Sequence, residues 1–375
     1  MKIYELPTPC YVIDEKKLRE NLEILKQVKD EAGCKILLAQ KAFSCFFEYP
    51  LIGKYLDGTT ASGLFEARLG HEEMGKENHV FAPAFKEVEM EELTDICEHI
   101  VFNSFAQLEK YWELCRKKGV SIGLRVNPEC STQGEHAIYD PCAPGSRLGM
   151  TIDHFNEAWA DRLDGLHFHT LCEQNSDDLE KTLDAFEEKF GSYLSGMKWL
   201  NMGGGHHITR ADYDIPRLIR CIRRIKERYG VQVYLEPGEA VALNAGYLVT
   251  EVMDVVENGI WTLILDASAA CHMPDVLEMP YRPPLKDSGL PDEKAYTYRL
   301  SSCTCLAGDV IGDYSFDREI HVGDRLYFED MAIYSMVKNN TFNGMCLPSI
   351  AVMKEDGDCQ LVRQFGYEEF KGRLG

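Results

Sequence analysis

Three kinds of chemically useful residue follow short apolar runs of strand length. Lys41 comes directly after the run KILLAQ, and a lysine in that position is partly desolvated, which lowers its pKa and frees the amine for Schiff-base chemistry. Three glycines, Gly203 to Gly205, follow another run, where bare backbone lets N–H groups approach an anion such as a phosphate. The carboxylate of Glu236 ends a third run. An amine, a phosphate cradle and a carboxylate together are what pyridoxal phosphate requires, so we predict this coenzyme.

The elements that must bring these residues together are eight short apolar runs, which alternate with amphipathic helical stretches. The spacing of about 21 residues across the first five runs is what a βα unit needs. Eight such units predict a closed (β/α)8 or TIM barrel over residues 13–245, with its active site where the strands end. The longer gap at 130–149 is predicted to be a loop over that end. The runs are Lys35–Gln40, Gly58–Ser62, His79–Pro83, His99–Asn103, Ser121–Asn127, Asp164–His169, Trp199–Gly203 and Gln232–Glu236.

The sequence pattern changes after the last of these runs. Segments such as GYLVTEVMDVVENGIWTLILDAS and DRLYFEDM are rich in strand-forming residues, and turn signals such as Asn258-Gly259 and Asp356-Gly357 interrupt this part of the chain. We therefore predict a separate antiparallel β domain made of residues 246–375, which takes in residues 1–12 as a strand.

The composition narrows the class of partner. The net charge of −21 would repel a phosphate backbone, which argues against nucleic acid, and it would raise the local concentration of a cationic substrate. The sequence has no run of 18 apolar residues and no recognisable signal peptide, so we expect a cytoplasmic protein without a membrane partner. The 14 cysteines lack the paired spacing of a zinc site or a disulfide framework, and we interpret most of them as small buried residues.

Seven motifs spread over essentially the whole chain resemble those of a known enzyme family. They are TPCYVID, LAQKAFS, GLHFHTLCE, NMGGGHH, LEPGEAV, CTCLAGD and YSMVKNNTFNG. The chain resembles the fold-type III pyridoxal-phosphate decarboxylases, which have an alanine-racemase type barrel, and among them the carboxynorspermidine (carboxyspermidine) decarboxylase family. The resemblance implies that a homodimer with shared active sites converts carboxynorspermidine or carboxyspermidine to norspermidine or spermidine and carbon dioxide, in polyamine biosynthesis.

The resemblance assigns roles residue by residue. Lys41 matches the lysine that joins the coenzyme covalently, and His169 matches the histidine that stacks on its pyridine ring. Glu236 matches the carboxylate that pairs with the pyridine nitrogen and keeps it protonated, so that the ring acts as an electron sink. Tyr334 matches a tyrosine whose hydroxyl contacts the phosphate. The backbone donors for the phosphate match Gly203, Gly204, Gly205 and Gly238.

A second group of matching residues lies in the predicted β domain. Cys305 and Asp309, in CTCLAGD, match a cysteine-and-aspartate motif that reaches the site from the partner subunit in related enzymes. The resemblance implies that Cys305 returns a proton to the carbanion as a general acid. It implies that Asp309 lies at the substrate.

Two departures from the family pattern bear on the substrate. Thr170-Leu171-Cys172 stands where a Gly-Ser pair normally helps to hold phosphate, and Glu239 replaces the arginine of a Glu-Pro-Gly-Arg motif. A glutamate there repels a phosphate or a carboxylate and attracts an ammonium group. Asp275 and Glu278 add acids where related enzymes contact the distal end of the substrate. These acids predict a cationic amino acid with a long amine tail.

Other functions remain open from the residues alone. A diaminopimelate- or ornithine-type decarboxylase is the nearest alternative. Four histidines at the strand ends, His167, His169, His206 and His207, would suit a zinc hydrolase, but such enzymes carry their His pair on the first strand, and we predict no metal. A non-enzymatic coenzyme-binding barrel is a further alternative, but it would give no function to Cys305 in the predicted β domain, which counts against it. A racemase would need a tyrosine base where CTCLAGD stands.

Some features have no predicted role. Arg125, Arg147 and the loop at 130–149 stay unassigned, and the sequence does not show how the phosphate is held without the Gly-Ser pair. The two carboxylated triamines differ by one methylene, which is worth about 1–3 kcal/mol in an apolar pocket. The residues therefore do not distinguish these two substrates.

Overall fold

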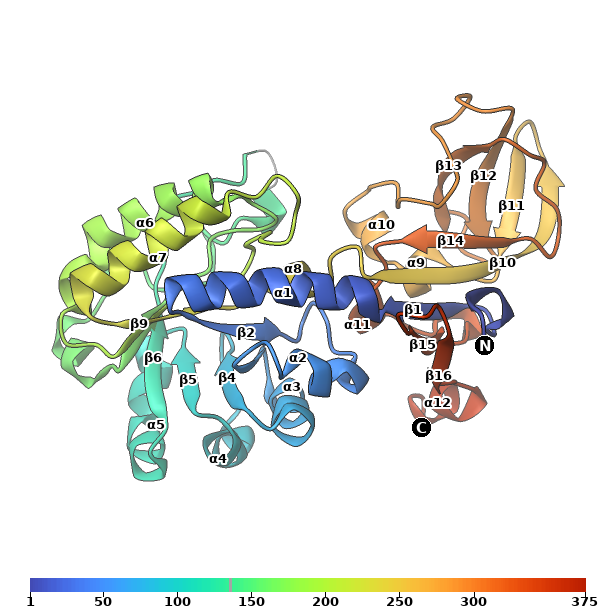
Figure 1. Cartoon of the computed structure of the whole chain (residues 1–375). Coiled ribbons are helices and arrows are strands. Elements are labelled where there is room, and N and C mark those ends of the chain that lie inside the picture. The colour runs from blue at the N-terminus through green and yellow to red at the C-terminus, as the bar shows by residue number, and fades with distance from the viewer. Residues whose placement is uncertain (135–136) are drawn as a thin grey trace. The chain divides into compact units, whose positions relative to one another are not determined.

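The computed structural model describes residues 1–134 and 137–375, and these form two compact units (Figure 1). The barrel unit is Asn21–Val241, and the β unit combines Met1–Glu20 with Ala242–Gly375. Residues 135 and 136 of the loop predicted at 130–149 lie outside the described part of the chain.

Eight parallel strands close into the predicted barrel. Each strand pairs with the next along the chain, and β9 pairs back with β2 through Ile36 and Leu235. Because a parallel strand buried on both faces needs a nearly continuous apolar run, these strands could be located from the sequence. The barrel fold is confirmed. The strands are β2 (Lys35–Ala39), β3 (Gly58–Ala61), β4 (Glu77–Phe81), β5 (His99–Phe102), β6 (Ser121–Arg125), β7 (Gly165–His167), β8 (Trp199–Asn201) and β9 (Gln232–Leu235).

The longer helices of the barrel unit bury an apolar stripe. In α7, for example, Leu218, Ile222 and Ile225 are fully buried, and Asp214 caps the first turn by accepting a hydrogen bond from the Arg217 N–H at 3.0 Å. Among the described residues, no helix has both the length and the apolar character that crossing a bilayer requires. The main helices are α1 (Glu15–Ala32), α3 (Leu64–Leu69), α4 (Glu87–Ile96), α5 (Phe105–Lys118), α6 (Ser176–Phe190) and α7 (Ile215–Tyr229).

An aromatic layer fills the barrel toward the N-terminal ends of the strands. The rings of His79 and His99 stack at 3.9 Å, and His99 in turn stacks on Trp199 at 4.9 Å. A Cβ added to Gly123 or Gly165 would lie 2.3 or 2.1 Å from the Trp199 indole, so these glycines make room for it. The interior at this level is therefore closed, and the chemistry must lie at the other end.

Burial of His99 predicts acid sensitivity. Desolvation, together with the electrostatic influence of the neighbouring His79, lowers the pKa of His99 to about 2. The folded chain keeps this imidazole neutral while the unfolded chain protonates it near pH 6.5, so its contribution to stability is complete above pH 6.5 and falls as the pH drops below it. Between pH 7.5 and 5 we expect it to remove about 2 kcal/mol from the unfolding free energy.

Chemical denaturation of the wild type and of His99→Phe at both pH values measures this contribution. Phenylalanine keeps a ring in the stack but cannot titrate, so the variant should lose about 2 kcal/mol less than the wild type on acidification. Equal losses in the two proteins would contradict the prediction.

The β unit contains an eight-stranded sheet in which β1 occupies a central position. The strand order is β13-β12-β11-β10-β1-β15-β16, and β14 pairs with β10. All five residues of β1 are buried, because Tyr11 packs into one apolar cluster while Cys10 and Val12 pack into another. The strands are β1 (Cys10–Asp14), β10 (Gly246–Glu257), β11 (Trp261–Leu265), β12 (Tyr296–Ser302), β13 (Val310–Phe316), β14 (Arg325–Glu329), β15 (Ser349–Met353) and β16 (Cys359–Arg363).

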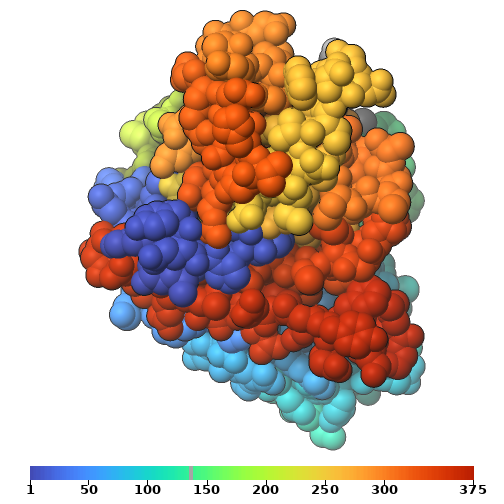
Figure 2. Space-filling view, turned by 90° about the vertical axis from the view of Figure 1, so that its right-hand side faces the viewer, coloured from blue at the N-terminus to red at the C-terminus, as the bar shows by residue number. Residues whose placement is uncertain are grey.

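The prediction that this sheet is antiparallel throughout is wrong for two pairings. β1 pairs with β15, and β11 with β12, in parallel register. Neither pair is joined by a hairpin turn, so nothing in the local chain imposes an antiparallel direction. Figure 2 shows the blue N-terminal residues beside the red C-terminal part of the same unit, where Met1 O also accepts a hydrogen bond from the Cys359 N–H at 2.6 Å.

Candidate active site

Lys41 lies at the C-terminal end of β2. Solvent reaches its side chain, but the surrounding barrel atoms remove water from the amine, and this desolvation together with the positive charge of Arg125 lowers its pKa. The nearby charge of Glu236 opposes the shift only in part. A lysine with a lowered pKa is more often the neutral amine that carbonyl addition needs.

Glu236 follows β9, the strand that pairs with β2. It is buried, and its two carboxylate oxygens interact with separate neighbours: Oε1 accepts a hydrogen bond from Asn201 Nδ2 at 2.7 Å, and Oε2 lies 3.3 Å from His167 Nε2. Burial alone would raise the pKa of Glu236, but the interactions with His167 and Asn201 bring it to about 2. The carboxylate is therefore ionised at neutral pH. Asn201 was not predicted, although it lies only two residues before the triple glycine in NMGGGHH.

The glycine turn after β8 packs against the end of β7. A Cβ on Gly203 would lie 2.5 Å from the Phe168 carbonyl oxygen, and a Cβ on Gly204 would lie 2.4 Å from the Glu236 carbonyl oxygen. The Gly204 N–H donates to His169 Nδ1 at 3.2 Å, so the turn and the predicted ring-stacking histidine are neighbours. Burial and the charges of Lys41 and Arg125 hold the pKa of His169 well below its usual value, and the imidazole is neutral.

These residues fit the predicted coenzyme. An amine, a neutral histidine and an ionised carboxylate lie at the strand ends of one barrel, next to a turn that admits no side chain. Gly238 belongs to the same edge, since a Cβ there would lie 2.6 Å from Ala42 Cβ and 3.1 Å from the Ala39 carbonyl oxygen. Two of the three glycine N–H groups already form hydrogen bonds within the protein. The Gly203 N–H donates to Asn201 Oδ1 at 2.8 Å, and the Gly204 N–H donates to His169 Nδ1, as described above. The phosphate role of the individual glycines stays a prediction.

The residues that depart from the family pattern lie on the barrel unit. Glu239 is 19% exposed, and its carboxylate lies 3.8 Å from His207 Nε2. Burial raises the pKa of the Cys172 thiol to about 12, so it remains neutral and donates only weakly. Arg125, which had no predicted role, donates from Nη2 to the His169 carbonyl oxygen at 3.0 Å and lies over the Phe81 ring. Arg125 thus supports the strand end that carries His169.

The four histidines of the zinc alternative do not come together. His206 Nε2 lies 3.3 Å from the Met202 carbonyl oxygen, and His207 faces Glu239 instead. His167, His169 and Glu236 do have ligand atoms within 4.8 Å of one another, which is close enough to hold a metal ion. The metal and coenzyme interpretations therefore compete for the same side chains, and elemental analysis beside an absorbance scan of purified protein separates them.

In the β unit, Asp309 is fully engaged by its own loop and by the segment that follows β11. Its buried carboxylate accepts hydrogen bonds from the Ser268, Ser302 and Thr304 hydroxyls at 2.6 to 2.7 Å, and from the Ala269 N–H at 2.8 Å. These bonds organise the segment that leads to Cys305. Asp309 therefore has a clear structural role, and its predicted contact with substrate stays a prediction.

Cys305 is exposed at the tip of the segment that follows β12. Its backbone N–H donates to Asn343 Oδ1 at 2.7 Å, which ties the tip to a second loop. Cys303, two residues earlier, is also exposed and directs its thiol to Met345 Sδ at 3.6 Å. The two thiols thus have different surroundings despite their spacing.

Tyr334 adopts a strained backbone conformation. Its φ is 55° and its ψ is −40°, and the Ser335 N–H donates across it to the Ile333 carbonyl oxygen at 2.6 Å, which makes a tight γ-turn. A positive φ is uncommon for a bulky residue and costs on the order of 1–3 kcal/mol. Such strain concentrates at functional positions, which supports the predicted role of this tyrosine.

Asp275 and Glu278 lie on one short helix, α10 (Asp275–Glu278), and share a cation. Both carboxylates form ion pairs with Lys338 of α11 (Ser335–Lys338), at 2.5 Å in the case of Glu278. The two carboxylates and the Lys338 ammonium together thus carry a net charge of −1, whereas the carboxylates alone would carry −2. A cationic substrate that reached these acids would share them with Lys338.

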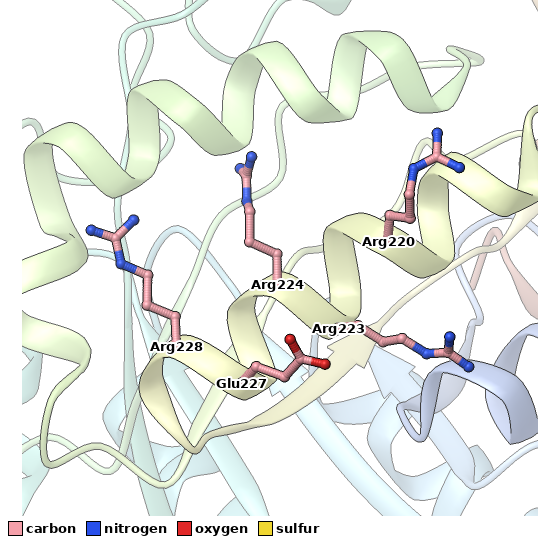
Figure 3. Close-up of a pocket in the computed structure, with 5 residues that line it drawn as sticks. All are labelled: Arg220, Arg223, Arg224, Glu227 and Arg228. Carbon is pink, nitrogen blue, oxygen red and sulfur yellow. The ribbon is translucent and has the colours of Figure 1, made fainter.

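A shallow depression on the outer face of α7 is lined by arginines and lies away from the strand ends (Figure 3). Arg224 and Arg228 both pair with Glu187, at 2.8 and 2.9 Å. Arg223 Nη2 donates to the Glu31 carbonyl oxygen at 2.6 Å. These contacts describe a solvated ion-pair surface rather than a site for chemistry.

Comparison with known proteins gives a consistent result. The family profile described as pyridoxal-dependent decarboxylase, C-terminal sheet domain, matches residues 10–332. A carboxynorspermidine/carboxyspermidine decarboxylase of Campylobacter jejuni subsp. jejuni is 43% identical, over 98% of this chain and 99% of the relative. A carboxyaminopropylagmatine decarboxylase of Synechocystis sp. is 41% identical, over 100% of this chain and 97% of the relative. The crystal structure of carboxynorspermidine decarboxylase from Campylobacter jejuni, complexed with norspermidine, matches with a TM-score of 0.93 at 42% identity, over 98% of this chain and 100% of that chain.

Proposed function

Because the chain belongs to the pyridoxal-dependent decarboxylases, we propose that it decarboxylates carboxynorspermidine and carboxyspermidine to norspermidine and spermidine. The coenzyme of this family is pyridoxal phosphate. When bound, it supplies the electron sink that stabilises the carbanion left by carbon dioxide. We infer a cytoplasmic enzyme of polyamine biosynthesis.

The observation that carries the proposal is the placement of Lys41 and Glu236 at the ends of neighbouring strands on one rim of the barrel. Both follow strands that are hydrogen-bonded to each other, β2 and β9, and the amine has a lowered pKa while the carboxylate is ionised. In the proposed enzyme Lys41 would bind the coenzyme covalently, Glu236 would hold the proton of the pyridine nitrogen, and His169 would lie against the ring. Tyr334 and the glycines Gly203, Gly204, Gly205 and Gly238 would contact the phosphate.

Turnover of a panel of amino acids tests the substrate. Carboxynorspermidine and carboxyspermidine should be converted with kcat/KM values at least about 100-fold above those for diaminopimelate and ornithine. The acidic residues disfavour the distal carboxylate of diaminopimelate, and they favour a long, multiply charged amine tail over the single terminal amine of ornithine. Carboxyaminopropylagmatine belongs in the same panel, since a relative acting on it is almost as similar to this chain. Preference for diaminopimelate or ornithine would overturn the proposal.

Glu239 is the residue that we expect to select the amine tail. Glu239→Arg reverses a half-buried charge, so kcat/KM for carboxynorspermidine should fall roughly 100-fold while that for diaminopimelate holds or rises. Glu227→Arg makes the same charge change on the outer face of α7 and should leave both values within about twofold. An unchanged preference in Glu239→Arg would remove the argument for this residue.

The acids of the β unit are the other residues that we propose for substrate binding. Asp275, Glu278 and Asp309 are proposed to face the substrate, with Lys338 sharing the first two. Cys305 is proposed to act as general acid in the active site of the partner subunit of a homodimer. The exposure of its loop tip supports this role, because a donor to another subunit has to project from its own.

A further inference from the structure

Asn201 makes two hydrogen bonds that join opposite ends of the candidate active site. Its Nδ2 donates to Glu236 Oε1 at 2.7 Å, and its Oδ1 accepts from the Gly203 N–H at 2.8 Å. The side chain is 1% exposed, so neither bond is replaced by water when it breaks. One amide thus connects the carboxylate that is proposed to face the pyridine nitrogen with the turn that is proposed to face the phosphate.

His167 supports the same carboxylate from the other side. Its Nε2 lies 3.3 Å from Glu236 Oε2, its side chain is also 1% exposed, and its ring packs at 5.4 Å from that of Phe81. Each Glu236 oxygen therefore has its own partner, and both partners come from neighbouring strands, β7 and β8. A buried carboxylate held at both oxygens has little freedom to rotate, which is what a fixed contact with a ring nitrogen needs.

We propose that Asn201 and His167 are positioning residues that hold the Glu236 carboxylate in place, and that Asn201 also ties it to the glycine turn. Neither residue touches the coenzyme or the substrate in this scheme. Both act through Glu236, so the inference rests on the proposed role of that residue. A merely structural role would lower stability but would leave the spectrum of bound coenzyme unchanged.

Two substitutions at Asn201 test its two bonds. Asn201→Asp keeps an acceptor for the Gly203 N–H but replaces the amide donor with a second carboxyl group against Glu236, whereas Asn201→Leu loses both bonds. Hydrogen-bond partners behind a functional group are worth roughly 10- to 100-fold. We expect Asn201→Asp to lower kcat by that factor with KM nearly unchanged, and Asn201→Leu to weaken coenzyme binding as well.

The same pattern is expected at His167, where a conservative variant offers rescue. His167→Leu removes the partner of Glu236 Oε2 and should lower kcat roughly 10- to 100-fold. His167→Gln retains an N–H donor and should recover most of that loss. In the affected variants the absorbance spectrum of the bound coenzyme should change with pH over a range different from that of the wild type.

Two further variants make the outcome decisive. Asn78 is a buried amide near the N-terminal end of β4, donating to the Ala67 carbonyl oxygen at 2.8 Å and accepting from the Thr59 hydroxyl at 3.2 Å. Asn78→Asp should leave kcat and the spectrum of the folded protein as in the wild type. If Glu236→Gln also keeps wild-type kcat and spectrum, the proposed role of Glu236 fails. If Glu236→Gln loses both while Asn201→Asp and His167→Leu keep both, the inference about the positioning residues is wrong.

Discussion

Lys41→Ala is expected to lower kcat by at least about 10³-fold. The physical reason is that the variant loses the amine at the end of β2, whose pKa is lowered by desolvation and by the charge of Arg125. The variant should remain folded, because the side chain is exposed and alanine removes no core contact. Steady-state turnover of carboxynorspermidine and a thermal melt measure the two effects separately.

Covalent labelling adds a test that does not depend on activity. Borohydride treatment of coenzyme-loaded protein, followed by peptide mapping, should mark Lys41 and nothing else. Lys54→Ala removes an exposed lysine elsewhere on the barrel unit and should label as the wild type does. A mark on another lysine, or activity retained by Lys41→Ala, would overturn the assignment of the amine.

Cys305→Ala is expected to lower kcat by about 10² to 10⁴-fold, because the carbanion would lose its proton donor. Binding of coenzyme and substrate should change little, since the alanine removes only a thiol at an exposed loop tip. Cys303→Ala is a matched control, because it removes an exposed thiol two residues away whose neighbour is Met345. Equal effects of the two substitutions on kcat would contradict the special role of Cys305.

Mixing inactive variants tests whether the thiol acts across a dimer. Lys41→Ala and Cys305→Ala proteins, unfolded together and refolded, should regain up to about a quarter of wild-type activity, because half of the dimers are mixed and each of these has one intact site. If both residues served a site within one subunit, mixing would restore nothing.

The barrel could be predicted from the sequence because its strands are short, apolar and evenly spaced. That reasoning is weakest at α4, whose sequence EVEMEELTDI buries only Met90, Leu93 and Thr94 and therefore shows a weak apolar stripe. It also missed the parallel pairings of β1 and β11, since strand pairing depends on residues far apart in the chain. Periodicity reports what one element buries and not which element lies beside it.

Only some residues of the candidate site could be predicted from the sequence. Lys41 and Glu236 could be found because each follows an apolar run, which predicts a place at the rim. Asn201 could not, because its importance comes from two bonds to groups on other strands. The sequence predicted that the Asp309 carboxylate contacts the substrate. Only the structure shows that three hydroxyls and two backbone N–H groups already donate hydrogen bonds to it.

The central place of β1 affects the order in which the molecule can assemble. This strand is translated before the barrel unit, while its partners β10 and β15 are translated after it. Throughout synthesis of residues 21–241 a nascent chain therefore carries an apolar strand, CYVID, whose partners do not yet exist. Unpaired strands of this kind invite association between chains. The barrel is free to fold early, and the sheet is completed only when the last part of the chain has left the ribosome.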